Sequence, residues 1–239
     1  MLPVAILMGG LGTRVRPLTE TAPKALLPIG GEPFISHQLR LLRNRGIERV
    51  ILCVGYLGEQ IRDFVEDGAA FGLEIDYSWD GPVALGTAGA LRRALPKLGD
   101  AFFVIYGDSY LPCDYHAVEE TFLKSGGQAL MTVFHNEGQW DTSNVEFGKG
   151  QILAYDKKNR TERMHHIDYG LGVFKSRVFS GLPEKPCDLA TIYQDLLGRG
   201  ELAAFEVGER FYEAGSFEGI RALEEYFDTA DTTQGRQNG

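Results

Sequence analysis

Residues 4–14, VAILMGGLGTR, decide the fold of this chain. The five apolar residues that start this stretch stop abruptly at Gly9, which is typical of a buried strand that feeds a turn. Glycines there allow φ > 0 and let a ligand approach the backbone, and successive N–H groups can form a concave anion site. Arg14 and, ten residues later, Lys24 add two positive charges. We therefore predict a triphosphate-binding loop after the first strand, with an ordinary turn carrying two surface cations as the alternative.

Two common phosphate-binding motifs are excluded at this loop. No Gly-Lys-Ser/Thr follows the glycines, so the loop is not a P-loop. Val15 stands where the dinucleotide-binding fingerprint has its third glycine, so that motif is incomplete as well.

Composition narrows the class of protein and its partners. The net charge of −9 argues against a nucleic-acid partner, because phosphate contacts need a basic face. Cys53, Cys113 and Cys187 are isolated and lack metal-type spacing, so we expect reduced thiols and a cytoplasmic protein. The first apolar run is too short for a signal peptide, and no stretch reaches the roughly 18 apolar residues of a membrane span. We therefore expect no membrane partner.

Strand and helix patterns alternate through the first 135 residues. The expected strands are residues 4–8, 48–54, 73–79, 101–106 and 129–134, and the expected helices are residues 34–45, 58–66, 87–95 and 117–123. This alternation predicts βαβ units and an α/β fold with a parallel sheet. Ligands of such sheets bind at the carboxyl ends of the strands, where Gly9–Arg14 and Gly107–Asp108 fall.

The remainder of the chain is less regular. We expect short strands at residues 145–147, 152–155, 167–174 and 202–207, a strand near Phe211, and helices at 189–197 and 217–227. No segment is rich enough in Pro, Gly or Ser to act as a linker, so residues 1–227 are predicted to be one domain. Residues 228–239 are polar and lack apolar anchors, which predicts a flexible tail.

The stretch GGLGTRVRPLTETAPKALLPIGGEPF resembles the signature of the sugar-1-phosphate nucleotidylyltransferases, with G-G-x-G-T-R, P-L-T and P-K in order. The resemblance extends over about residues 3–227. It implies a Rossmann-like, mixed but mostly parallel sheet with helices on both faces, of the nucleotide-diphospho-sugar transferase type. It also implies a nucleotide-binding half, about residues 1–135, and a sugar-phosphate half, about 136–227.

The family activity would be transfer from an NTP to a sugar 1-phosphate, giving an NDP-sugar and pyrophosphate with Mg²⁺ as cofactor. YEAGS (212–216) and HHIDYG (165–170) are most similar to heptose-1-phosphate guanylyltransferases and N-acetylmuramate-1-phosphate uridylyltransferases. We favour GTP with a heptose or hexose 1-phosphate. Uridylyl or cytidylyl transfer to another sugar phosphate, phosphocholine or a phosphonate stays open, and the sequence leaves the oligomeric state open.

The resemblance also assigns roles to individual residues. Arg14, Lys24 and Asp108 would be catalytic, and Asp108 and Glu213 would hold the metal, with Glu213 replacing the aspartate of the family's D-x-G motif. Nucleotide contacts would come from Leu7, Gly9, Gly10, Gly12, Thr13, Arg14, Gly86 and Thr87. Sugar-phosphate contacts would come from Asn144, Lys158, Tyr169 and Gly170.

Each assignment has a structural alternative. Asp108 could cap its turn, Glu213 could be a surface glutamate before a helix, and Lys158 could be solvated within the charged run DKKNRTER. The small residues after Leu85 could serve only for helix packing. The protein could also be a non-catalytic sensor of nucleotides or sugar phosphates, or an unrelated α/β protein with coincidental glycine loops.

Overall fold

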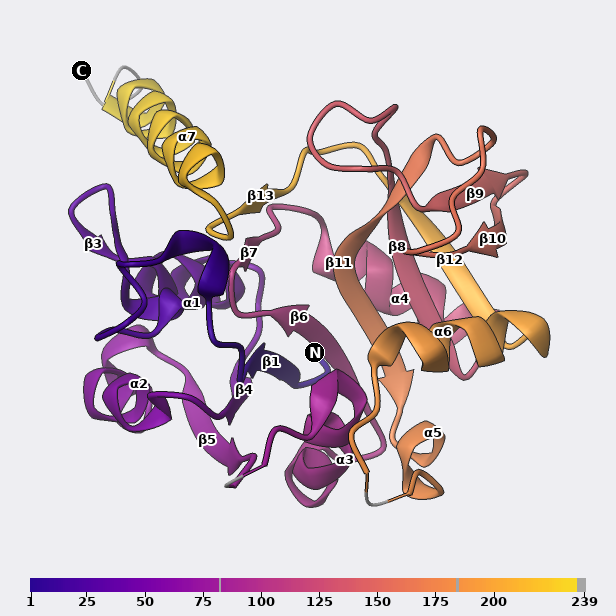
Figure 1. The fold of residues 1–239 in the computed structure, drawn as a ribbon, viewed down its shortest axis with the longest axis horizontal. Helices are drawn as coiled ribbons and strands as arrows, with labels where there is room; N and C mark the ends of the chain where they lie inside the picture. The colour runs from indigo at the N-terminus through magenta and orange to yellow at the C-terminus, as the bar shows by residue number, and fades with distance from the viewer. Residues whose placement is uncertain (82, 184, 236–239) are drawn as a thin grey trace.

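One mixed sheet organises the molecule in the computed structural model, which describes residues 1–81, 83–183 and 185–235. Nine strands of these residues form the sheet, with the strands of residues 1–106 on one side and those of residues 129–207 on the other (Figure 1). The sheet has a parallel half, residues 1–106, and a mixed half, residues 129–207.

The strands of the parallel half have the order expected for a nucleotide-binding sheet. They are, in spatial order, β5 (Glu74–Trp79), β4 (Arg49–Val54), β1 (Val4–Met8) and β6 (Ala101–Tyr106). Each pair of neighbours is parallel. The chain moves outward from β1 through β4 to β5 and then returns to place β6 on the other side of β1. Ligands of open α/β sheets bind at this reversal of strand order.

Helices cover both faces of the sheet, as predicted. On one face lie α1 (Phe34–Asn44), α2 (Gly58–Val65) and α4 (Tyr115–Ser125), and on the other α3 (Gly86–Leu98), α5 (Arg177–Ser180) and α6 (Leu189–Gly198). The alternation of side chains along β1 explains the two layers, because Val4 and Ile6 belong to the first core and Ala5 to the second. The predicted α/β fold is confirmed.

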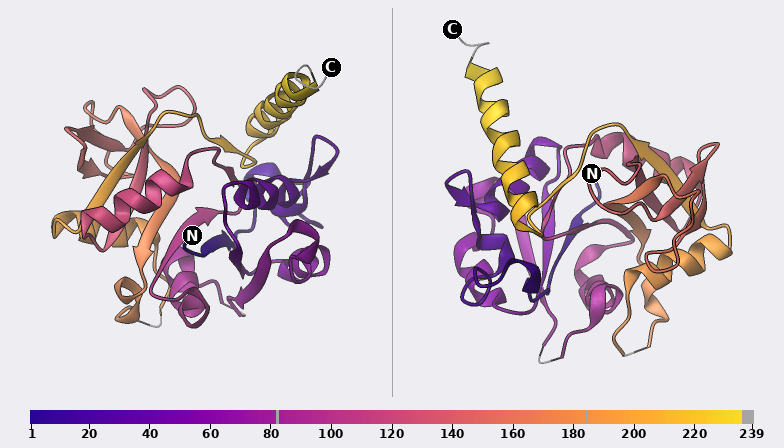
Figure 2. Two further views of the ribbon diagram at one scale, coloured as in Figure 1. Left: turned by 180° about the vertical axis from the view of Figure 1, so that it is seen from behind. Right: turned by 45° about the horizontal axis from the view of Figure 1, so that its top comes forward.

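The mixed half is built around the long strand β11 (His166–Lys175). It runs antiparallel to β6 and to β8 (Ala129–His135), and its register with β8 shifts between Asp168 and Gly172. The other strands of this half are β9 (Val145–Gly148), β10 (Gln151–Tyr155) and β12 (Leu202–Val207). β11 pairs with β6 only from Gly172 to Lys175, so its first part, residues 166–171, has no pairing with β6. Figure 2 shows the two halves of the sheet from behind and from above.

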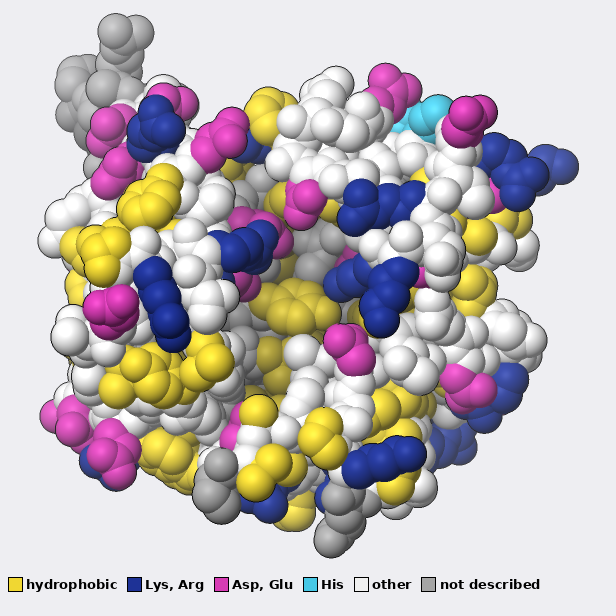
Figure 3. Space-filling view, viewed as in Figure 1, with side chains coloured by type: hydrophobic (Ala, Val, Ile, Leu, Met, Phe, Trp, Pro, Cys, Tyr) yellow, Lys and Arg dark blue, Asp and Glu magenta, His cyan; other side chains and the backbone are white. Residues whose placement is uncertain are grey.

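Two small strands join the halves above the cleft between them (Figure 3). β7 (Ser109–Tyr110) follows β6 and pairs with β13 (Tyr212–Glu213). β13 lies within residues 208–216, the segment between β12 and α7, hereafter the strap. Another short pair, β2 (Pro28–Ile29) with β3 (Glu32–Pro33), supports α7. Single turns of 3₁₀ helix cover Thr13–Val15, Lys24–Leu26 and Ala69–Phe71.

The closing helix is longer than predicted. α7 spans Phe217–Gly235, so residues 228–235, which we had assigned to a flexible tail, are helical. Once a helix has formed, each added residue gains a hydrogen bond at little extra cost, and Thr229 also bonds the carbonyls of Glu225 and Tyr226. Residues 236–239 lie outside the described residues. Within the described ranges, the helices lack the combination of length and apolar character needed to cross a bilayer.

Candidate active site

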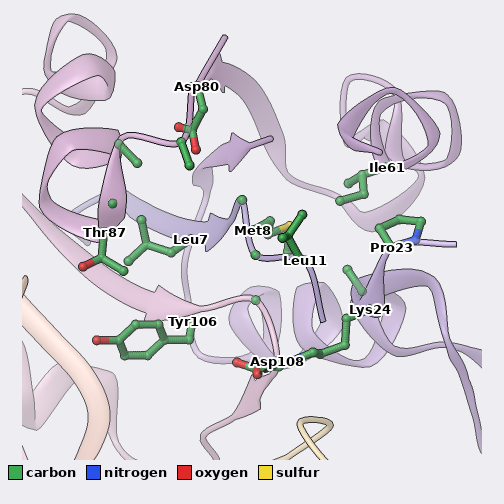
Figure 4. Close-up of a pocket in the computed structure, with 17 residues that line it drawn as sticks. Leu7, Met8, Leu11, Pro23, Lys24, Ile61, Asp80, Thr87, Tyr106 and Asp108 are labelled. Atoms are coloured by element: carbon green, nitrogen blue, oxygen red, sulfur yellow. Dashed lines mark hydrogen bonds and ion pairs between the residues drawn. The ribbon is translucent and has the colours of Figure 1, made fainter. Parts of the chain in front are cut away.

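The largest concentration of predicted site residues lies at the carboxyl ends of β1 and β6. These strands are direct neighbours, with Leu7 opposite Tyr106. A pocket of about 410 Å³ opens above them (Figure 4). It is lined by Leu7, Met8, Gly9, Gly10, Leu11, Pro23, Lys24, Ala25, Ile61, Asp80, Ala84, Gly86, Thr87, Ala90, Tyr106, Gly107 and Asp108. The first-strand loop and the Gly107–Asp108 turn therefore face one common space.

Lys24 and Asp108 form the central ion pair of this pocket. Lys24 Nζ lies 2.7 Å from Asp108 Oδ2, and the two side chains are only 17% and 22% exposed. Lys24 begins the 3₁₀ turn Lys24–Leu26, which directs its side chain toward the end of β6 (Figure 4). This arrangement supplies a fixed cation and a fixed carboxylate side by side, which is what binding of a phosphate together with a metal ion requires.

Arg14 reaches the same point from the glycine loop. A methyl group placed on Gly215 would lie 3.1 Å from an Arg14 guanidinium nitrogen and 3.4 Å from Asp108 Oδ2. The backbone before Gly215 lies close to Asp108 because Ala214 N donates a hydrogen bond to the Asp108 carbonyl oxygen at 2.7 Å. Arg14, Lys24 and Asp108, which lie far apart in the sequence, thus meet around one position.

Glu213 completes this group from the strap. It stands opposite Ser109 in the β13–β7 pair, one residue after Asp108. Burial, together with the charges of Asp108 and Asp141, raises the pKa of Glu213 to about 7, while Arg14 and Lys24 oppose the rise. A carboxylate forced this close to a second one is a ready ligand for a cation placed between them.

The glycine loop has the shape predicted for it. Gly12 has φ +62°, and a Cβ there would lie 2.9 Å from Thr19 Cγ2, so only glycine fits. Thr19 Oγ1 donates to the Gly12 carbonyl oxygen at 2.8 Å and holds the loop closed. Gly9 and Gly10 line the pocket, whereas Gly12 and Thr13 lie outside its lining, at the start of the Thr13–Val15 turn. The predicted contacts of Gly12 and Thr13 with a nucleotide stay predictions.

Gly86 and Thr87 line the other end of the pocket, where α3 begins. Gly86 has φ +71°, and a Cβ there would lie 2.5 Å from the Cys187 carbonyl oxygen. Thr87 Oγ1 accepts a hydrogen bond from Leu189 N at 2.7 Å, and Ala88 N donates to the Cys187 carbonyl oxygen at 3.0 Å. These bonds tie the start of α3 to Cys187 and to the first residue of α6, a second junction between the halves.

Asp80 is a site residue that the sequence indicated only as the first of residues 80–84, which were expected to contact the edge of the base. It is 9% exposed, lines the pocket at the end where α3 begins, and packs against Gly9 (Figure 4). Burial raises the pKa of its carboxyl, and Arg93 opposes the rise. The only signal in the sequence was its position just before the small-residue segment Leu85–Ala90.

The mixed half presents Lys157, not Lys158, to the cleft. Lys157 Nζ lies 3.6 Å from Asp168 Oδ2 and 5.7 Å from the centre of the Tyr106 ring, which itself lines the pocket. Lys158 is exposed, and its backbone N–H donates to Asp156 Oδ1 in a tight turn. Figure 3 shows Lys and Arg side chains on both sides of the central hollow. The geometry therefore favours Lys157 over the predicted Lys158.

The other predicted sugar contacts are placed unevenly. Tyr169 is 2% exposed and packs with Phe134 and Phe211, so its side chain is part of the core, contrary to expectation. Asn144 is 8% exposed and accepts from Asp168 N at 2.9 Å, which positions the strand that bears Asp168. Gly170 lies close to Tyr106 and Ser109, beside the end of β6.

The residues present fit a magnesium ion. Among the described residues no group of three or more His, Cys, Asp or Glu side chains is arranged to hold a metal. Mg²⁺ needs fewer protein ligands, since it keeps several waters and commonly binds one or two carboxylates plus substrate phosphates. Asp108 and Glu213 would supply two such carboxylates, and the charge of Asp108 is one cause of the raised pKa of Glu213.

A comparison with protein-family models identifies the family. Residues 4–207 match the model described as nucleotidyl transferase. The chain belongs to the nucleotidyl transferase family. The match covers both halves of the sheet and confirms the resemblance seen in the sequence.

Curated members of this family have related names. A UTP–glucose-1-phosphate uridylyltransferase of Synechocystis is 31% identical over 74% of this chain and 50% of the relative. An N-acetylmuramate α-1-phosphate uridylyltransferase of Neisseria meningitidis is 41% identical over 48% of this chain and 51% of the relative. A mannose-1-phosphate guanylyltransferase catalytic subunit β of Xenopus tropicalis is 30% identical over 84% and 58%. The chain thus spans little more than half the length of these relatives.

Solved structures confirm the fold of this nucleotidyl transferase. A putative glucose-1-phosphate thymidylyltransferase from Bacillus anthracis, in complex with sucrose, superposes with a TM-score of 0.84 at 23% identity, covering 95% of both chains. HddC from Yersinia pseudotuberculosis superposes with a TM-score of 0.80 at 24% identity, covering 95% of this chain and all of that one. The predicted nucleotide-diphospho-sugar transferase type of fold is confirmed.

Proposed function

We propose that the protein transfers a nucleotidyl group from an NTP to a sugar 1-phosphate, releasing pyrophosphate and an NDP-sugar. The observation that carries this proposal is the meeting of Arg14, Lys24 and Asp108 at one mouth of the nucleotide pocket. The names of the relatives support it, since all three describe nucleotidyl transfer to a sugar 1-phosphate.

The chain's own groups would align the reactants and neutralise charge. Gly9 and Gly10 leave the backbone open to the triphosphate, and Arg14 and Lys24 offset the charge that develops on the phosphorus oxygens. From the opposite wall, Lys157 would hold the phosphate of the sugar against Tyr106. No general base is required, because a phosphate oxygen is already ionised near neutral pH and can attack the α-phosphorus in line with the departing pyrophosphate.

Asp108 and Glu213 would hold the magnesium ion. When bound, Mg²⁺ supplies charge neutralisation on the phosphate oxygens. Without it, Asp108 is paired with Lys24, and Glu213 carries the raised pKa. Because glutamate carries the same carboxylate as the family's aspartate, Glu213 would still offer an oxygen ligand at this position.

The base end of the pocket favours GTP. A carboxylate is an acceptor with two oxygens, and Asp80 offers one there. Guanine has two adjacent N–H donors on its pairing edge, whereas uracil has one. A mannose-1-phosphate guanylyltransferase among the relatives and the structure of HddC complexed with GMP-PN are consistent with guanine. UTP is the alternative, because two of the relatives are named uridylyltransferases.

The test is a matrix of the common NTPs against hexose and heptose 1-phosphates, with Mg²⁺ and a pyrophosphate readout. We expect pyrophosphate from at least one pair, with GTP preferred. The Asp80→Asn variant should lose most of its preference for GTP over UTP. Binding of NTPs by thermal shift without any pyrophosphate release would instead identify a sensor and reject the proposed activity.

A further inference from the structure

A second cavity lies outside the nucleotide pocket. It has a volume of about 420 Å³ and opens between the loop after β8, the strap that bears β13, and the first turns of α7. Figure 1 shows this strap crossing from β12 to α7 above the cleft. Among the described residues, the two cavities share no lining residue. The second one therefore needs an explanation of its own.

Arg210 is the central side chain of this cavity. Its guanidinium carbon lies 3.4 Å from the centre of the Trp140 ring and 4.6 Å from that of Tyr212. Aromatic rings attract a guanidinium to their faces, so the two contacts fix the plane of this group. The N–H donors of a guanidinium lie in that plane. Stacking therefore leaves them free to bind something else.

Those donors lack partners within the described part of the chain. Arg210 Nε is buried without a hydrogen-bond partner there, and Arg210 forms no ion pair with these residues. A buried donor that has lost water without gaining an acceptor destabilises the fold. Glu213 lines the same cavity but forms no ion pair with Arg210 among the described residues. A fixed, partly buried and unsatisfied cation is the arrangement expected of an anion site.

A second arginine strengthens the positive charge at the opening. Arg221 lines the cavity from α7, is exposed, and likewise forms no ion pair or hydrogen bond with the described residues. Glu218 and Glu225 line the same rim, but both are exposed to solvent, which screens their repulsion of an anion. We expect these two glutamates to weaken binding without preventing it.

We propose that this cavity, hereafter the Arg210 cavity, binds a phosphate or carboxylate group through the edge of the Arg210 guanidinium, with Arg221 as a second cation. Guanidinium groups bind both anions through paired N–H donors. The anion could be a second charged group on the sugar phosphate, because Glu213 lies between the cavity and the cleft, or it could be a separate small molecule.

The chain contains a built-in probe for this site. Of its two tryptophans, Trp79 and Trp140, only Trp140 lines the Arg210 cavity. The Trp79→Phe protein would be titrated with inorganic phosphate at constant ionic strength, with chloride as the balancing anion. We expect a saturable change in Trp140 fluorescence at millimolar phosphate. Adding Arg210→Gln should abolish saturation, and adding Arg221→Gln should weaken apparent affinity several-fold.

Arg199→Gln is the matched control, because Arg199 is a surface arginine of the same half that pairs with Asp195. This variant should titrate like its parent, and circular dichroism would verify that all variants fold. A linear response of the parent protein would overturn the proposal. So would an unchanged curve in the Arg210→Gln variant, because the phosphate would then be binding elsewhere, for example at Arg14 and Lys24.

A second arm identifies the source of the anion and rests on the proposed transferase activity. The KM of the Arg210→Gln variant would be compared with that of its parent for a hexose 1-phosphate and the matching 1,6-bisphosphate. A rise of about tenfold for the bisphosphate alone would assign the anion to the substrate. Equal KM values, with saturable fluorescence in the parent, would assign the site to a separate anion. If no sugar phosphate reacts, the proposed function fails, but the fluorescence arm still decides whether the site exists.

Discussion

The parallel and mixed halves of the sheet contribute different things to the cleft. The parallel half supplies its reactive groups from loops that follow adjacent strands, β1 and β6, so their positions are set by sheet register. The mixed half supplies Lys157 and Asp168 from a region where β11 shifts register against β8. Regular strand pairing therefore fixes the positions of the proposed reactive groups, whereas the irregular pairing of β11 shapes the wall that would face the sugar phosphate.

The largest effect should come from breaking the pair in the parallel half. Lys24→Met removes the cation that we propose offsets charge in the transition state, so we expect kcat to fall by about 10²–10³-fold with little change in KM. Asp108→Asn should lose at least as much, because it removes a proposed metal ligand. Steady-state kinetics measure both. Wild-type kcat in either variant, with an unchanged thermal midpoint, would contradict the assignment of chemistry to this half.

The second prediction concerns Glu213, which lies on the strap after the mixed half and pairs with Ser109, next to Asp108. Its pKa rises from 4.5 to about 7 in the folded protein, so the folded state binds more protons than the unfolded one between these pH values. The stability of the metal-free protein should therefore fall as pH rises through this window. Glu213→Gln should raise the free energy of unfolding by about 1–3 kcal/mol at pH 8, at roughly 1.4 kcal/mol per pKa unit. Near pH 4 it should have almost no effect.

Thermal melts at the two pH values provide the measurement, with about 2–4 °C expected per kcal/mol for a chain of this size. Added Mg²⁺ should raise the melting temperature of the wild type at pH 8 and raise that of Glu213→Gln less, because binding to the folded state alone stabilises it. Equal stability of the wild type and Glu213→Gln at pH 8 would show that folding does not raise the pKa of Glu213.

The smallest effect distinguishes two adjacent lysines of the mixed half. Lys157→Met removes the cation beside Asp168 and Tyr106, so we expect KM for the sugar phosphate to rise about tenfold with kcat nearly constant. Lys158→Met is the matched control and should behave like the wild type, because neither the ion pair with Asp168 nor the contact with Tyr106 involves its side chain. A rise in KM for Lys158→Met alone would instead support the sequence prediction that Lys158 contacts the sugar phosphate.

The sequence predicted the parallel half almost completely. β6 matches its expected bounds, Ala101–Tyr106, because a short apolar run ending at Gly107 is a strong local signal. The glycine loop, Lys24 and Asp108 were predictable because each lies directly after a strand or in a recognisable motif. Their meeting followed from the rule that parallel strands end at the same edge.

The mixed half was harder because local patterns do not decide the direction of its side chains. Lys157 and Lys158 lie in a bend after β10, where strand alternation does not apply, and Tyr169 of β11 turns into the core beside Asp168. Nothing local in the apolar run IDYGLGVF shows which of its residues faces the cleft. The pairing of Glu213 with Ser109 joins residues about one hundred positions apart. Asp80 was expected only as part of residues 80–84, and its burial distinguishes it from its neighbours.

The cleft is tied at both ends, by the β7–β13 pair and by the bonds that join the start of α3 to Cys187 and to the first residue of α6. A wide hinge motion between the halves would have to break both connections. The proposed reactive groups would therefore be held in place before substrates bind. Electrostatic stabilisation by groups held in this way needs no rearrangement at the moment of reaction, so the rate of turnover should be insensitive to solvent viscosity except through product release.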